Sequence, residues 1–226
     1  MKIWTGDEAM QFLTTVSNHR LYALFYLALS TGMRQMELLG LKWQDFDELR
    51  GVLHVQRQLS RSGGVFLPLK TKAAKRSIKL SNDMIKALQK HNQLQLKERY
   101  EAGDHWKEMD LIFTSTIGNP LNFKNIIERH FKPILKASNV PVIRFHDLRH
   151  TAASLMLNTG VPPIVVTMLM GHSRPSITLD IYGHLIPSMQ PDVADKIDDL
   201  VTPIKLHPIA PELHPILSSE ETHPHI

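Results

Sequence analysis

Two short stretches place an arginine beside a second ionisable residue at the spacing of one helical turn. In "TGMRQMELL", Arg34 follows a glycine and begins a predicted helix, and Glu37 lies one turn further on to orient it. In "HDLRHTAASLML", His146 and Arg149 are three residues apart and share one face of a predicted helix. A guanidinium presents a planar fork of donors that matches two oxygens of a phosphate and stays charged at any useful pH. These residue types therefore indicate binding of an anionic group such as a phosphodiester.

A third stretch, "GHSRPSITLDIYGH", adds a histidine and a tyrosine. His172 ends one predicted helix, and Tyr182 follows ten residues later on a short one. A phenol, with a pKa of about 10, is a weak nucleophile when neutral and a tolerable leaving group. Taken singly, each residue also has a structural explanation: an arginine that caps a helix, a histidine in a satisfied core, a tyrosine on a half-buried face.

Taken together and in this order, the three stretches closely resemble the signature segments of the tyrosine recombinase family, the phage integrases. The resemblance runs from about Trp4 to Leu200 and includes a basic β-hairpin between the first two stretches. It implies a mainly α fold with a small antiparallel β-sheet (α+β), like the catalytic core of type IB topoisomerases. It also implies a site-specific recombinase that cleaves and rejoins DNA strands through a 3′-phosphotyrosyl intermediate.

The resemblance implies a set of six catalytic residues: Arg34, Lys70, His146, Arg149, His172 and Tyr182. Tyr182 would attack the scissile phosphate, and His146 is placed to receive its proton. A hairpin lysine would protonate the leaving sugar oxygen. The segment "LKTKAAKRSIKL" offers both Lys70 and Lys72, and Lys70 is favoured because a lysine-threonine pair before the turn is the commoner family pattern. No cofactor and no metal are implied, and the sequence offers no carboxylate cluster to hold a metal.

Helix signals dominate the elements that must position these side chains. Thr5 and Glu8 form a capping-box pattern at the start of the first helix, and a buried second helix ends at Gly32. Further helices are predicted at 34–40, 81–100, 122–137, 146–159, 162–171 and 188–201. From Val52 the period changes, and the segments "VLHVQRQ", "VFLPLK" and "RSIKL" predict a small antiparallel sheet.

The distribution of charge indicates a polyanionic partner. The net charge is +4, but residues 190–226 hold seven acidic residues and two lysines, which leaves +9 on residues 1–189. Residues 52–82 contain no acidic residue and seven basic ones. Such a cluster suits double-stranded DNA, although a solvated hairpin face would look the same. The predicted phosphate contacts are Arg57, Arg61, Lys72, Lys75, Arg76, Lys124 and Arg129.

The domain prediction is a catalytic domain at 1–201 followed by a disordered tail, rich in proline and histidine, at 202–226. Family members usually carry an N-terminal core-binding domain, which we expect to be absent here. The family works as tetramers on two DNA sites, and 192–201 is the segment expected to dock on a neighbour; packing of this segment within its own chain is the alternative. The chain contains no cysteine, no apolar run of membrane length and no secretion signal, which together predict a cytoplasmic protein.

Two other functions fit parts of the pattern. One is a non-catalytic DNA-binding protein that retains the recombinase fold, although a binder has no reason to keep Tyr182. The other is a metallohydrolase, with His146 and His150 four residues apart on a helix and His172 as a third zinc ligand. No glutamate lies between the two helical histidines to act as a base, and Arg149 would direct a positive charge towards the metal.

Overall fold

A computed structural model describes residues 2–61 and 64–183 of the chain. These residues belong to one compact unit that extends over Met1–Pro187. The predicted helix at 188–201 and the predicted tail at 202–226 lie outside the described residues. No helix in the described part of the chain has both the length and the hydropathy of a transmembrane segment.

The first two helices begin and end where their local signals predict. Helix α1 (Gly6–Thr15) starts with a capping box, in which the Thr5 hydroxyl accepts from the Glu8 amide at 3.2 Å and the Thr5 amide donates to the Glu8 carboxylate at 2.8 Å. Helix α2 (Tyr22–Thr31) is buried on most of its surface and ends at Gly32, whose φ of 61° is left-handed. A short helix α3 (Gln35–Leu39) follows and ends at Gly40, as predicted.

The β-segments form two small antiparallel sheets. The three-stranded sheet has the order β1-β2-β5, and the two-stranded sheet pairs β3 with β4. The strands are β1 (Phe46–Asp47), β2 (Val52–Val55), β3 (Arg57–Leu59), β4 (Phe66–Pro68) and β5 (Arg76–Lys79). The predicted segment "VLHVQRQ" is therefore divided at Gln56, and its two halves pair with different partners. Two short 3₁₀ turns, η1 (Trp43–Asp45) and η2 (Lys72–Ala74), flank the strands.

The remaining helices supply most of the core. Helix α4 (Asn82–Ala102), capped by Ser81, packs on α2 and ends in the 3₁₀ turn η3 (Gly103–His105). The predicted helix from Asn122 is continuous, but it contains a π-helical turn: α5 (Phe123–Asn125), η4 (Ile126–Phe131) and α6 (Lys132–Ser138). Phe12, Phe25 and Phe131 pack ring against ring in the main core.

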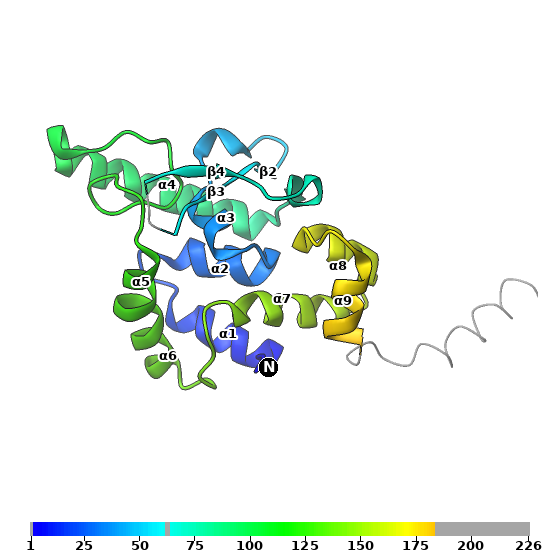
Figure 1. Ribbon diagram of the computed structural model, residues 1–226. Helices are drawn as coiled ribbons and strands as arrows, with labels where there is room; N and C mark the ends of the chain where they lie inside the picture. The colour runs from blue at the N-terminus through cyan, green and yellow to red at the C-terminus, as the bar shows by residue number, and fades with distance from the viewer. Residues whose placement is uncertain (1, 62–63, 184–226) are drawn as a thin grey trace, which may run out of the picture. The chain divides into compact units, whose positions relative to one another are not determined.

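Three helices at the end of the described chain carry two of the signature stretches. They are α7 (Asp147–Asn158), α8 (Pro163–Met170) and α9 (Pro175–Tyr182). Figure 1 shows α7 passing along α2 and ending beside α8 and α9, while α3 and the strands lie on the other side of α2. This arrangement brings α3, β5, α7 and α8 to one place, although they are distant in sequence.

Candidate functional site

A cavity of about 640 Å³ lies between α3, the β3–β4 hairpin and the start of α7. Three of the predicted catalytic residues line it: Arg34 from α3, Lys70 after β4 and His146 before α7. Arg61 and Thr71 also contribute to the wall. Lys72 is not among the lining residues, so the cavity distinguishes the two candidate lysines and favours Lys70.

The C-terminus of α8 gathers three arginines. Each of three consecutive backbone carbonyls accepts one hydrogen bond from a guanidinium: Leu169 from Arg76 Nε at 2.6 Å, Met170 from Arg149 Nη2 at 2.7 Å, and Gly171 from Arg34 Nη2 at 3.1 Å. The last carbonyls of a helix have no partner within the helix and carry the negative end of its dipole, so they attract cations. The end of one helix thus fixes side chains from β5, α7 and α3.

The carboxylate of Glu37 bridges two of these arginines, Arg34 and Arg76. Its side chain is 1% exposed, and its carboxylate accepts from Arg34 Nη1 at 2.9 Å and from Arg76 Nη2 at 2.8 Å. Burial alone would raise the pKa of Glu37, but the charges and hydrogen bonds of Arg76 and Arg34 outweigh burial and lower it. The predicted contact between Glu37 and Arg34 is present, and Arg76 is a second guanidinium bound to the same carboxylate.

Arg149 is the most deeply buried of the predicted catalytic cations. It is 5% exposed, and besides Met170 its guanidinium bonds to the carbonyl of Gly32 at 2.5 Å. Burial and the nearby charge of Arg34 lower the pKa of Arg149 to about 9, so the group remains charged at neutral pH. Among the described residues, three guanidiniums are thus gathered with the single bound carboxylate of Glu37, and this excess of positive charge suits the binding of an anion.

Gly171 is required by this arrangement, and its replacement provides a prediction. Its φ is 63°, and a Cβ at this position would lie 2.8 Å from Arg76 Nη1. We expect Gly171→Ala to destabilise the protein by about 1–2 kcal/mol through left-handed strain alone, and by more because Arg76 must shift. Gly160→Ala is the matched control, since Gly160 has a φ of 83° and no heavy atom near the position of a Cβ. Thermal unfolding of both variants measures the difference; equal losses would contradict a role for the Arg76 contact.

His172 directly follows this helix end and bonds to a threonine. Its Nδ1 lies 2.9 Å from Thr178 Oγ1, whose hydroxyl also accepts from Thr167 at 2.8 Å. Burial, followed by the charges of Arg149, Arg34 and other neighbouring cations, lowers the pKa of His172 to about 4. His172 is therefore neutral at physiological pH and serves as a hydrogen-bonding group rather than a cation.

Tyr182 is buried rather than directed into the cavity. It is 1% exposed, and its hydroxyl lies 2.6 Å from Nδ1 of His150. Burial raises the pKa of the Tyr182 phenol to about 12, although the charge of Arg149 acts in the opposite direction. The sequence predicted that His146 receives the proton of the phenol, but the histidine in contact with the hydroxyl is His150. The sequence suggests His150 only as a zinc ligand. Its spacing of one helical turn from His146 is the signal that could have placed it in the site.

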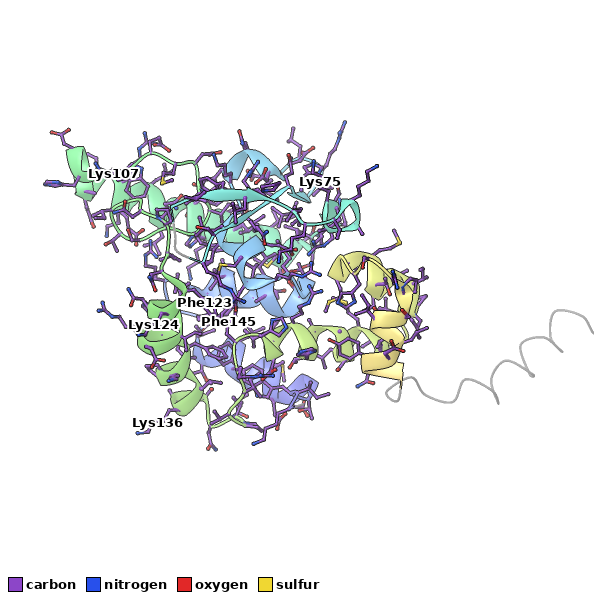
Figure 2. All side chains as sticks on the ribbon, viewed as in Figure 1. Lys75, Lys107, Phe123, Lys124, Lys136 and Phe145 are labelled. Carbon is purple, nitrogen blue, oxygen red and sulfur yellow. The ribbon has the colours of Figure 1, made fainter. Side chains whose placement is uncertain are left out.

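The predicted phosphate contacts divide into two groups. Arg61, Lys72, Lys75, Lys124 and Arg129 are exposed. Figure 2 shows Lys75 beside the hairpin turn and Lys124 on α5, at opposite sides of the view, so the exposed cations do not form one cluster. Arg57 forms an ion pair with the buried Asp45. Arg76 has a side chain that is only 7% exposed, and its donors bond to protein groups. Arg76 was predicted to lie on a DNA-contacting surface, and it lies in the interior instead.

A zinc site would require three ligands around one point. His146 and His150 are neighbours, with ring centroids 5.2 Å apart, but the part of the chain that the structure describes contains no group of three His, Cys, Asp or Glu side chains that could hold a metal. The observed partners of His150 and His172 are Tyr182 and Thr178. The geometry therefore gives the metallohydrolase alternative no support.

Comparisons with known proteins agree with this arrangement. A tyrosine recombinase XerC-like protein of Caldanaerobacter subterraneus is 34% identical over 215 residues, covering 88% of this chain and 54% of that protein. The Tn1549 transposon integrase, solved in complex with a circular intermediate DNA, is 22% identical with a TM-score of 0.71 and covers 87% of this chain and 66% of its own. The catalytic domain of bacteriophage HP1 integrase has a TM-score of 0.58 at 17% identity and covers 91% of this chain and 99% of its own. At these identities the two structural likenesses show the fold alone.

The curated relatives are longer than this chain, which spans about half the length of those it matches first. The match to the family model covers residues 2–188 and thus includes every one of the predicted catalytic positions. The chain belongs to the phage integrase family, a family of DNA recombination and integration.

Proposed function

We propose that the chain is the catalytic part of a site-specific DNA recombinase that cleaves and rejoins strands through a 3′-phosphotyrosyl intermediate. The single observation that carries the proposal is the arginine cluster at the end of α8, placed beside a cavity that Lys70 and His146 also line. A phosphodiester in this cavity would meet fixed cations on several sides. The structural relative in complex with DNA supports a nucleic-acid partner.

The cluster suits the transition state better than the ground state. When an oxygen attacks the phosphorus, negative charge grows on the two non-bridging oxygens, and the donors that wait there do not have to reorganise. Arg34 has a side chain that is 39% exposed, and its guanidinium has donors left after bonding to Glu37 and Gly171. Arg34 is therefore the arginine that first contacts a bound phosphate, while Arg149 supports it from the interior.

The proposed reaction conserves the bond energy of the phosphodiester. The Tyr182 oxygen forms a bond to phosphorus, its proton passes to a base, and the bond from phosphorus to the 5′-oxygen of the sugar breaks. Lys70 gives a proton to that leaving oxygen, because an alkoxide leaves poorly without one. In the reverse direction a 5′-hydroxyl displaces the phenol from phosphorus, so no nucleotide cofactor is needed. We further propose that this exchange takes place within a tetramer on two DNA sites.

The identity of the general acid can be tested by comparing the two hairpin lysines. Lys70→Ala is expected to slow cleavage by about 100-fold or more, whereas Lys72→Ala retains most of the cleavage rate because Lys72 does not line the cavity. A substrate with sulfur in place of the leaving 5′-oxygen should restore cleavage by Lys70→Ala, since a thiol with a pKa of about 8.5 leaves without a proton. Equal defects in the two variants, or no recovery with the sulfur substrate, would remove Lys70 from this role.

The proposal itself is tested by trapping the covalent intermediate. A library of nicked duplexes with a randomised core serves as the substrate, because a strand cut next to a nick loses its short 5′-hydroxyl fragment and cannot be rejoined. The expected product is a DNA-protein adduct that resists SDS, with the linkage mapped by mass spectrometry to the peptide that contains Tyr182. A protein that binds the library but forms no adduct would instead be the non-catalytic DNA-binding protein considered above.

A further inference from the structure

The hydroxyl of Tyr182 is held by a histidine that the proposed reaction has not yet used. His150 lies on α7, one turn after His146, and its Nδ1 is 2.6 Å from the hydroxyl of Tyr182 at the end of α9. The two ring centroids are 5.8 Å apart with an interplanar angle of 53°. The phenol ring is fixed in a small apolar cluster with Ala153, Leu157, Val166 and Met170. Its only polar atom is thus directed at His150.

The surroundings of His150 decide which group donates in this hydrogen bond. His146, Asp147, Arg149 and Arg144 lie around it on and before α7, and His172 faces it from the end of α8. Burial, then the charge of His146 and those of the arginines, lowers the pKa of His150, with Asp147 acting in the opposite direction. His150 is therefore neutral at pH 7. The pKa of the phenol is raised to about 12, so its hydroxyl keeps its proton. Among the described residues the hydroxyl has no other hydrogen-bond partner, so it donates to Nδ1, and the imidazole hydrogen then lies on Nε2.

His150 also contacts both the tyrosine and a residue that lines the cavity. His146, which lines the cavity, contacts the ring of His150 edge to face at a centroid distance of 5.2 Å. The ring of Tyr182 contacts the same histidine at a centroid distance of 5.8 Å, but Tyr182 is not among the residues that line the cavity. The phenol must leave its buried position to reach a phosphate, and its path begins at His150.

We infer that His150 positions the phenol of Tyr182 in the DNA-free protein and accepts its proton when the oxygen attacks phosphorus. This inference rests on the proposed function and deepens it. In the step, the O–H bond of Tyr182 breaks, the proton moves to Nδ1 of His150, and the oxygen uses the released electron pair to bond to phosphorus. The bond from phosphorus to the 5′-oxygen breaks, and Lys70 supplies the proton for that oxygen. The imidazolium of His150 returns its proton to the phenol when the strand is rejoined.

Two substitutions separate positioning from proton transfer. His150→Asn places an amide oxygen near the position of Nδ1, so it can still accept a hydrogen bond from the phenol but cannot take the proton. His150→Ala loses both functions. His105→Asn is the matched control, because His105 lies exposed in η3 after α4 and outside the site. Thermal unfolding of each variant shows whether it is folded. If His150→Ala does not fold, the proton-transfer role is still tested by His150→Asn.

The positioning role is measured without DNA. Tetranitromethane nitrates accessible tyrosines, and peptide mapping gives the rate at each one, with Tyr100, which is 89% exposed, as the internal reference. Tyr182 should be protected in the wild type, in His105→Asn and in His150→Asn. In His150→Ala its nitration should rise about tenfold, because losing one hydrogen bond raises the open population by that order. Nitration of Tyr182 at the wild-type rate in a folded His150→Ala would overturn the positioning role.

The proton-acceptor role is measured by adduct formation on the nicked library. Because the pKa of His150 is lowered, the wild-type rate at pH 7 should already be on its plateau, and it should fall only in more acidic solution. His150→Asn should be about 100-fold slower at pH 7.5, with a rate that rises with pH up to pH 9 because hydroxide must take the proton. Wild-type rate and pH dependence in His150→Asn would overturn the inference while leaving the proposed function intact. Failure of the wild type itself to form an adduct would overturn the proposed function and the proton transfer together.

Discussion

Replacing Tyr182 with phenylalanine is expected to abolish the covalent adduct with DNA while leaving binding of the duplex unchanged. The phenol oxygen is the atom that the proposed reaction bonds to phosphorus, and no other group can replace it in that place. The phenyl ring still fills the apolar cluster of Ala153, Val166 and Met170, so the fold should lose only the hydrogen bond to His150. That loss is worth about 1 kcal/mol. Adduct formation on the nicked library and gel shifts on the same DNA measure the two effects.

Tyr100→Phe is the control for this experiment, because Tyr100 is 89% exposed on α4 and contacts nothing in the site. It should form the adduct at the wild-type rate. An adduct that persists in Tyr182→Phe would show that another residue is the nucleophile, and the function of the arginine cluster would then have to be reconsidered.

Replacing Arg34 with alanine should slow adduct formation by about 100- to 1000-fold, the usual effect of removing one fixed donor from a charged transition state. Binding should weaken much less, because many phosphates of the duplex contribute to it and this arginine contacts one. Arg34 is a better test than Arg149, since its side chain is 39% exposed, whereas Arg149 is buried and its removal would leave a cavity in the interior. Cleavage rates at saturating DNA, compared with gel shifts, separate the two effects.

Arg50→Ala is the matched arginine control, with a side chain that is 84% exposed and paired with Asp47. It should cleave at the wild-type rate. Arg34→Lys adds a second comparison: an ammonium restores the charge but not the planar fork, so it should recover only part of the rate. Full recovery with lysine would mean that charge alone, and not the paired donors, is what the phosphate needs.

Local signals in the sequence were sufficient for most of the fold. The capping box of Thr5 and Glu8 and the left-handed Gly32 mark the ends of the first two helices because the partners lie within four residues. The division of the strand at Gln56 and the short strand β1 were not predicted. Each depends on which distant strand pairs with which, and that choice is made by tertiary packing.

Within the candidate site, the sequence predicted one of the side-chain contacts and missed two others. The pairing of Arg34 with Glu37 follows from one helical turn, and it is present. Arg76 bonds to Leu169, 93 residues away, and Tyr182 bonds to His150, 32 residues away. No spacing rule reaches so far, so Arg76 was expected on the surface and His146 beside the phenol. Arg76 and Tyr182 are both buried, and a buried polar side chain bonds to the polar atoms that tertiary packing brings near it.

The carbonyls at the end of α8 belong to the main chain, and this has a consequence for how the protein can diverge. Exposed side chains along that helix, such as Ile164 and Met168, can be exchanged while the three arginines keep their anchors, provided that the helix still ends at a glycine. A rigid shift of the helix, by contrast, would carry all three guanidiniums with it and misalign them in a single movement. The site should therefore tolerate substitutions on the exposed face of α8, but it should be sensitive to any contact that tilts this helix.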